Sequence, residues 1–313
     1  MAAHRTHDRA EILTLEAGAH ALAERLPELM VEASRIAHTV AHGIHGRRRA
    51  GPGETFWQFR QYQPGDATSL IDWRRTASAS HVYIRQREWE AAHTMWLWPD
   101  LSTSMEFRSS LAPVTKRDRA LVLGLALSEL LVRGGERVGL LGLTQPTASR
   151  KAVVKLAEAI LMRGEEAALS EGLPPRTRLQ RFSGVILISD FLDPIEAIGE
   201  RIAALAGHGV KGHVVQVLDP AEETLPFEGR LEFIGPEGGE RWVADRVESL
   251  RADYQAKLTA HRAALIETTR KLGWSFLLHH TDRPASEPLL NLIALLQGGG
   301  SYQYQAIQRD VQL

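Results

Sequence analysis

The order of hydrophobic and polar positions predicts alternating strands and helices from residue 93 onward. Five short, mostly apolar segments have the length of buried strands: 94–98, 137–143, 184–189, 213–218 and 274–279. Helical periodicity fills most of the chain between them, near 116–133, 150–163, 194–207 and 246–272. Apolar strands that alternate with helices are typical of a mostly parallel sheet covered on both faces. The pattern therefore predicts an α/β fold.

The residues before this region show two other patterns. Apolar residues recur at spacings of three and four over 8–45, which predicts helices, and Pro27 marks either a break or the first turn of a second helix. Aromatic and charged residues crowd together afterwards, and 81–87 alternates like a strand. Between 230 and 245 a turn flanked by apolar residues predicts a hairpin.

These patterns divide the chain into four parts. We expect an N-terminal helical segment and a small β-rich segment that packs on the main domain. The main α/β domain and a loose tail follow. The corresponding ranges are 1–45, 46–92, 93–297 and 298–313.

Polar side chains follow two of the predicted strands. Asp100, Ser102 and Ser104 come after the first strand, and Asp190 comes after the third. Because parallel strands end at one edge of a sheet, we expect these four side chains to face each other there. Carboxylate and hydroxyl oxygens suit a hard divalent cation such as Mg²⁺. The sequence therefore offers a metal site at the carboxyl edge of the sheet.

A purely structural role for the same residues is the alternative. Asp and Ser often form turn and N-cap hydrogen bonds, and Asp100 and Ser102 fit that role. Asp190 fits an N-cap too, although Asp193, which directly precedes Pro194, is the better candidate for it. The residues alone leave both interpretations open.

Composition narrows the classes of partner. The 313 residues are 44% hydrophobic, carry a net charge of −1 and include no cysteine. Near-neutral charge argues against general nucleic-acid binding, and the lack of cysteine excludes disulfides and thiolate metal sites. We find neither a secretory signal nor an apolar run long enough to span a membrane, so we expect a cytoplasmic protein.

Two further clusters of side chains, one of histidines and one of arginines, could bind a ligand. His38, His42 and His45 share a helical face and could bind a metal, although solvated histidines at a helix end are commoner. Three consecutive arginines, Arg47–Arg49, lie in a Gly/Pro-rich loop that could bind phosphate or could be a solvated loop.

Two motifs resemble known families. Asp100-Leu101-Ser102-Thr103-Ser104 matches the D-x-S-x-S signature of von Willebrand factor A domains. The residues upstream resemble the hallmark of a bacterial family called domain of unknown function 58, and so does Asp219-Pro220 with Glu222. The upstream motif residues are Arg60, Tyr62, Gly65, Asp66, Asp72, Trp73 and Arg74.

The resemblance implies a von Willebrand A-like fold and a site like the metal-ion-dependent adhesion site, in which Asp100, Ser102, Ser104 and Asp190 hold the metal. It also implies a non-catalytic interaction module that works with a MoxR-type AAA+ ATPase in assembly or chaperone-like activation. A complete adhesion site takes a threonine from a middle loop. The threonines in that region are Thr144, Thr147 and Thr177, none of them in a Gly-Thr setting.

Two other functions compete with this interpretation. A metal-dependent or serine hydrolase is one, but no Gly-x-Ser-x-Gly elbow surrounds Ser102, and no second aspartate stands two residues after Asp100. Nucleic-acid binding through Arg47–Arg49 and the aromatic-rich segment is the other. Acidic residues interleaved with the arginines there oppose contact with phosphate.

Overall fold

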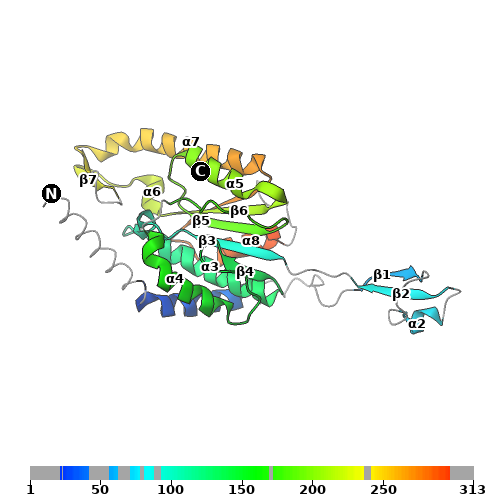
Figure 1. The fold of residues 1–313 in the computed structure, drawn as a ribbon. Coiled ribbons are helices and arrows are strands. Elements are labelled where there is room, and N and C mark those ends of the chain that lie inside the picture. Colours follow the sequence, from blue (N-terminus) through cyan, green and yellow to red (C-terminus); the bar gives the residue numbers. More distant parts are fainter. Residues whose placement is uncertain are drawn as a thin grey trace, which may run out of the picture.

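A five-stranded parallel sheet forms the centre of the protein (Figure 1). The structure is a computed structural model. Its strands follow the order β4 (Arg137–Leu140), β3 (Thr94–Pro99), β5 (Gly184–Ser189), β6 (Lys211–Leu218) and β9 (Ser275–His280). All five coincide with predicted strands, which confirms the α/β fold. The structure describes residues 22, 24–41, 56–62, 71–77, 81–87, 93–168, 172–235 and 241–296.

Helices cover both faces of this sheet (Figure 1). Helical residues 24–41 pack on one face with α3 (Lys116–Arg133), α4 (Ala152–Ala168) and α8 (Ser286–Leu296). The opposite face carries α5 (Ile195–Leu205) and α7 (Arg251–Lys271). Pro27 lies within the helical residues 24–41 and does not break them.

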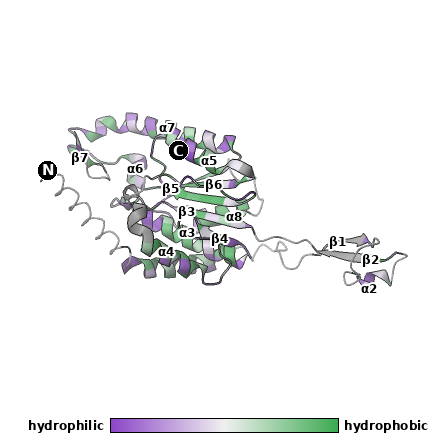
Figure 2. Cartoon of the chain, in the orientation of Figure 1, coloured by the Kyte–Doolittle hydropathy of each residue, from purple (hydrophilic) through white to green (hydrophobic). Residues whose placement is uncertain are grey.

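The strand sequences explain why both faces are covered. All six residues of β5 are buried, so neither face of that strand meets water. In β3, Met95 and Leu97 pack on the α3 face, whereas Trp96 and Trp98 pack on the α5 face. Figure 2 shows the same contrast, because β5 is strongly hydrophobic while α7 mixes hydrophobic and hydrophilic residues.

The connection between β4 and β5 is unusual. Helix α4 packs against α3, and an extended segment then contributes Leu173 and Leu179 to the core on the α5 face. This segment passes beside Trp96 and Trp98 and brings its first described residue, Gly172, to the carboxyl edge of β3.

Short elements complete the main domain. The predicted hairpin is present as β7 (Leu231–Ile234) and β8 (Arg241–Ala244). A five-residue helix, α6 (Pro220–Thr224), follows β6 and was not predicted. Three single turns of 3-10 helix are η2 (Thr103–Glu106), η3 (Gly207–Gly209) and η4 (Val247–Leu250).

The upstream segment contains an antiparallel pair, β1 (Phe56–Gln61) with β2 (Tyr83–Arg87), and a four-residue helix α2 (Trp73–Thr76). Asp72 caps α2 by accepting a hydrogen bond from the backbone N–H of Arg75 at 2.9 Å. The described part of this segment therefore contains two paired strands, and its bounds of 46–92 stay a prediction. Its packing on the main domain stays a prediction, because residues 88–92 lie outside the described chain.

Candidate functional site

The strand order reverses between β3 and β5. In chain order β3, β4 and β5 are the first, second and third strands of the sheet, yet β3 lies between the other two. Such a switch point leaves a crevice at the carboxyl ends of the strands, where ligands bind in open α/β sheets. Asp100 follows β3 and Asp190 follows β5, so both predicted carboxylates lie at this point.

Asp100 is a buried carboxylate held by hydroxyl and amide groups. Its side chain accepts hydrogen bonds from the backbone N–H of Ser102 at 2.9 Å and from the hydroxyl of Ser189 at 2.7 Å. Burial raises the pKa of Asp100 to about 6, and the charge of Asp190 adds to the rise, while these hydrogen bonds oppose it. No ion pair in the described part of the chain includes Asp100, so its negative charge lacks a cationic partner there.

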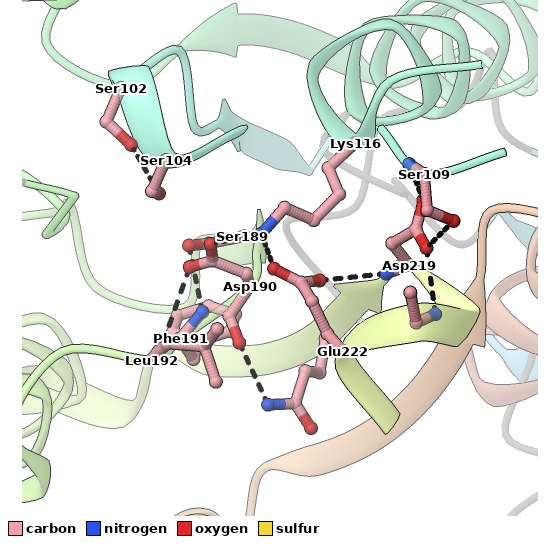
Figure 3. Close-up of polar contacts among 12 residues, drawn as sticks. Ser102, Ser104, Ser109, Lys116, Ser189, Asp190, Phe191, Leu192, Asp219 and Glu222 are labelled. Atoms are coloured by element: carbon pink, nitrogen blue, oxygen red, sulfur yellow. Dashed lines mark hydrogen bonds and ion pairs between the residues drawn. The ribbon is translucent and has the colours of Figure 1, made fainter. Parts of the chain in front are cut away.

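Asp190 lies in a different electrostatic environment (Figure 3). The ammonium nitrogen of Lys116 is 2.8 Å from Asp190 Oδ2 and 2.5 Å from Glu222 Oε1. Lys116 is only 1% exposed. Burial alone would lower the pKa of Lys116, but the charges of Asp190 and Glu222 outweigh it and raise that pKa. Asp190 therefore already has an internal cation.

Sequence reasoning missed Lys116. It is the first residue of α3, where a positive charge opposes the helix dipole. A lysine in that unfavourable position, at the edge where two strand-end carboxylates meet, was the signal that would have identified it.

The two serines lie beside Asp100. The hydroxyl oxygens of Ser102 and Ser104 are 3.2 Å apart and share a hydrogen bond (Figure 3). A Cβ atom built on Gly172 would stand 3.3 Å from Ser102 Oγ, 3.4 Å from Asp100 Oδ2 and 2.9 Å from Asp193 Oδ2. Three oxygens from two loops, one after β3 and one after β5, thus surround the position that a Cβ atom at residue 172 would occupy.

Asp193 is thus a site residue that the sequence assigned to a different role. We predicted that Asp193 caps the following helix, but the N-cap of α5 is Pro194 and no side chain caps it. The carboxylate of Asp193 lies instead near Asp100 and Ser102.

The middle-loop threonines serve local turns. Thr144 Oγ1 accepts a hydrogen bond from the backbone N–H of Leu140 at 2.9 Å, and Thr147 Oγ1 accepts one from Ser149 at 3.1 Å. Gly172, which lies between β4 and β5, is the residue that this connection brings against Asp100.

A second network joins the loop after β3 to α6. Asp219 caps α6 in a capping box with Glu222 and is completely buried. It also accepts hydrogen bonds from Ser109, at 2.8 Å from the backbone N–H and 2.5 Å from the hydroxyl (Figure 3). Because Lys116 binds Glu222, α6 is held to the candidate site at two points.

The other predicted residues lie elsewhere or outside the described residues. Trp73 and Arg74 are exposed on α2, and Tyr62 is half-buried after β1. His38 lies on the N-terminal helix, where it contacts Arg133. The remaining residues or their side chains are not described: Arg60, Gly65, Asp66, His42, His45 and Arg47–Arg49. Within the described ranges, no three His, Asp or Glu side chains group as metal ligands.

The fold and the site define a class of protein. It is an α/β domain with polar side chains at the carboxyl edge of its sheet, where one of two strand-end carboxylates is paired with a lysine. The family model described as "Protein of unknown function DUF58" matches residues 58–264. The chain therefore belongs to the DUF58 family.

Relatives extend over most of the chain. The chain is 29% identical over 299 residues to "Uncharacterized protein Rv1480" of Mycobacterium tuberculosis, covering 91% of this chain and 92% of that protein. It is 33% identical over 121 residues to "Uncharacterized protein MAV169" of Mycobacterium avium, covering 38% and 70%. Among solved structures, "conserved hypothetical protein BatB from Bacteroides thetaiotaomicron" matches with a TM-score of 0.35 and 17% identity. That match covers 66% of this chain and all of that one.

None of the described helices combines the length and the apolar composition that crossing a membrane requires.

Proposed function

We propose that this protein is a non-catalytic interaction module that binds its partner through the carboxyl edge of the sheet. A divalent cation such as Mg²⁺ is held there beside Asp100, and a carboxylate of the partner completes its coordination. The fold is of the von Willebrand A-like type that the D-x-S-x-S motif implies. The partner is a MoxR-type AAA+ ATPase, and the complex serves assembly or chaperone-like activation.

The unpaired charge of Asp100 is the observation that carries this proposal. Buried charges in proteins are normally paired or bound to metals. Asp190 is paired with Lys116, whereas the described residues give Asp100 hydrogen bonds and no cation. Around Asp100, Asp190 and Glu222 there is one ammonium for three carboxylates. A divalent cation would offset the excess negative charge.

The donor groups fit a hard cation. Carboxylate and hydroxyl oxygens from Asp100, Ser102 and Ser104 lie on one loop, and Asp193 Oδ2 approaches the same place. Asp190 belongs to the ligand set implied by the resemblance, but its Oδ2 atom already binds Lys116. We add Asp193 to that set because its Oδ2 atom lies near Asp100 and Ser102, and we keep Asp190 in the set, where its charge also acts on Asp100.

Calorimetric titration with Mg²⁺ and with Mn²⁺ tests the metal site. Wild type should bind one cation, and Asp100→Asn should lose this binding. Asp190→Asn and Asp193→Asn should each weaken it. Asp245→Asn is the matched control, because Asp245 is an exposed aspartate that directly follows β8 in the chain. Equal binding by wild type and Asp100→Asn would disprove the site.

The partner requires a separate experiment. A pull-down from the native host with wild type should recover an AAA+ ATPase in Mg²⁺, and less of it in a chelator. Asp100→Asn should recover as little as wild type in the chelator. Recovery that is independent of both the chelator and Asp100 would show that the partner binds elsewhere.

A further inference from the structure

A second polar site lies away from the switch point, between the N-terminal helix and the start of α8. A cleft of about 330 Å³ opens there, and residues from three segments line it. Arg35 comes from the N-terminal helix, Arg119 from α3, and Arg283 from the loop after β9. Three arginines thus line one cleft, together with two acidic residues, Glu32 and Asp282.

Arg119 is the unusual member of this set. It is 6% exposed, and one of its terminal nitrogens, Nη2, donates to the carbonyl of Thr281 at 3.0 Å. Its Nε–H is buried, and no described residue accepts a hydrogen bond from it. A buried donor without an acceptor destabilises the folded state. Such a group in a native protein needs a physical explanation.

The nearby carboxylates do not provide that explanation. Glu32, Asp282 and Asp118 favour the charged form of Arg119 by their charges, yet burial dominates and lowers its pKa. Asp118 Oδ2 contacts Arg25 and Thr115, and its buried Oδ1 has no hydrogen-bond donor among the described residues, Arg119 included. The Nε–H of Arg119 therefore lacks an acceptor among the described residues, and the residue lines a cleft.

The mouth of the cleft supplies additional positive charge and donors. Arg35 and Arg283 are exposed, and Arg283 Nε is 3.9 Å from Asp282 Oδ2. The turn Pro284–Ser286 leads into the first turn of α8. Helix N-termini favour anions, and the planar fork of arginine matches oxyanions by paired hydrogen bonds. The net charge of the five charged residues that line the cleft is positive by one, since they are three arginines and two acids.

We propose that this cleft binds a small oxyanion, a phosphate or a carboxylate group, on Arg119 with Arg35 and Arg283 closing over it. The site is independent of the divalent cation at the switch point. It would give the N-terminal helix a ligand-dependent contact with α3 and with the loop after β9.

Titration calorimetry with inorganic phosphate and with acetate tests this site. Sodium chloride of equal ionic strength serves as the reference, and a chelator in every sample prevents phosphate from bridging a metal at the switch point. Wild type should bind at least one of the two anions saturably with one site per chain. Binding of phosphate alone identifies a phosphate group as the ligand, and binding of acetate identifies a carboxylate.

Two variants separate the site from general charge effects. Arg119→Gln should weaken binding about tenfold or more, as expected when a charge-assisted hydrogen bond is lost. The double variant Arg35→Gln, Arg283→Gln alters only exposed side chains, so it decides the question if Arg119→Gln fails to fold. Arg246→Gln is the control, because Arg246 is 82% exposed before η4.

Two results would overturn the inference. One is the absence of saturable binding of either anion to wild type. The other is binding by the folded variants that equals binding by Arg246→Gln.

Discussion

Replacing Lys116 by methionine tests the electrostatic core of the site directly. Methionine has a similar length and no charge, so Asp190 and Glu222 would lose the ammonium that lies 2.8 Å and 2.5 Å from them. The side chains of Asp190 and Glu222 are 2% and 15% exposed, so water cannot fully replace the lost ammonium. Removing one partner of a buried ion pair costs about 3–5 kcal/mol. We expect the free energy of unfolding to fall by about that amount.

Urea unfolding at pH 7 and at pH 5 measures this loss of unfolding free energy and tests whether unpaired carboxylate charge causes it. The Lys116 ammonium lowers the pKa of Glu222, so its removal lets burial raise that pKa further. A carboxyl group whose folded pKa exceeds its unfolded value contributes stability that is present at low pH and lost as pH rises. The deficit of Lys116→Met should therefore be smaller at pH 5 than at pH 7.

Two comparisons isolate the ion pair. Lys257→Met makes the same substitution at an exposed position of α7 and should change the unfolding free energy by less than about 0.5 kcal/mol. Adding Asp190→Asn to Lys116→Met should restore part of the loss, because it removes an unpaired charge. A loss below about 1 kcal/mol for Lys116→Met, or one equal to that of Lys257→Met, would refute the reasoning.

Two further predictions concern the sheet. A Cβ atom on Gly212 would stand 2.0 Å from the buried indole of Trp274, so Gly212→Ala should lower the unfolding free energy by about 3 kcal/mol in urea titration. Gly207→Ala, where the Cβ meets open space, should leave it almost unchanged. Burial lowers the pKa of His279 to about 3, below its unfolded value of about 6.5. The contribution of neutral His279 to the free energy of unfolding is therefore fully present above pH 6.5 and is lost as the pH falls. Between pH 7 and pH 5 this loss is about 2 kcal/mol, and His279→Gln should reduce the measured loss by that amount; an unchanged pH dependence would contradict the assignment.

The sheet was predictable because its strands are buried on both faces. A segment such as 184–189 has no polar residue before Ser189, and the structure buries all six of its residues. Helix α8 escaped prediction because its apolar residues run almost continuously, and periodicity cannot distinguish such a run from a strand. Helix α6 is too short for any periodicity, and its capping box was visible only as a motif around Asp219.

The position of the site was predictable from the sequence, but the ion pair between Lys116 and Asp190 was not. Strand ends placed Asp100 and Asp190 at one edge, and the structure brings them near each other. The ion pair with Lys116 joins residues 74 positions apart in the chain, and no local pattern encodes such a contact. The approach of Gly172 and Asp193 depends on the irregular route between β4 and β5, which the periodicity of α4 does not reveal.

Because Lys116 pairs with Asp190 and not with Asp100, the two strand-end carboxylates differ in how far their charge is compensated. Both are buried to a similar degree, yet the ammonium lies on Asp190, and burial raises the pKa of Asp100 to about 6. A cation from solution gains most by binding the carboxylate whose charge is not already compensated. The fixed ammonium also repels a second cation, so it directs an external cation toward Asp100. Removing that ammonium should therefore strengthen Mg²⁺ binding in a folded Lys116→Met variant, while weaker binding would show that Lys116 orders the site rather than competing with the cation.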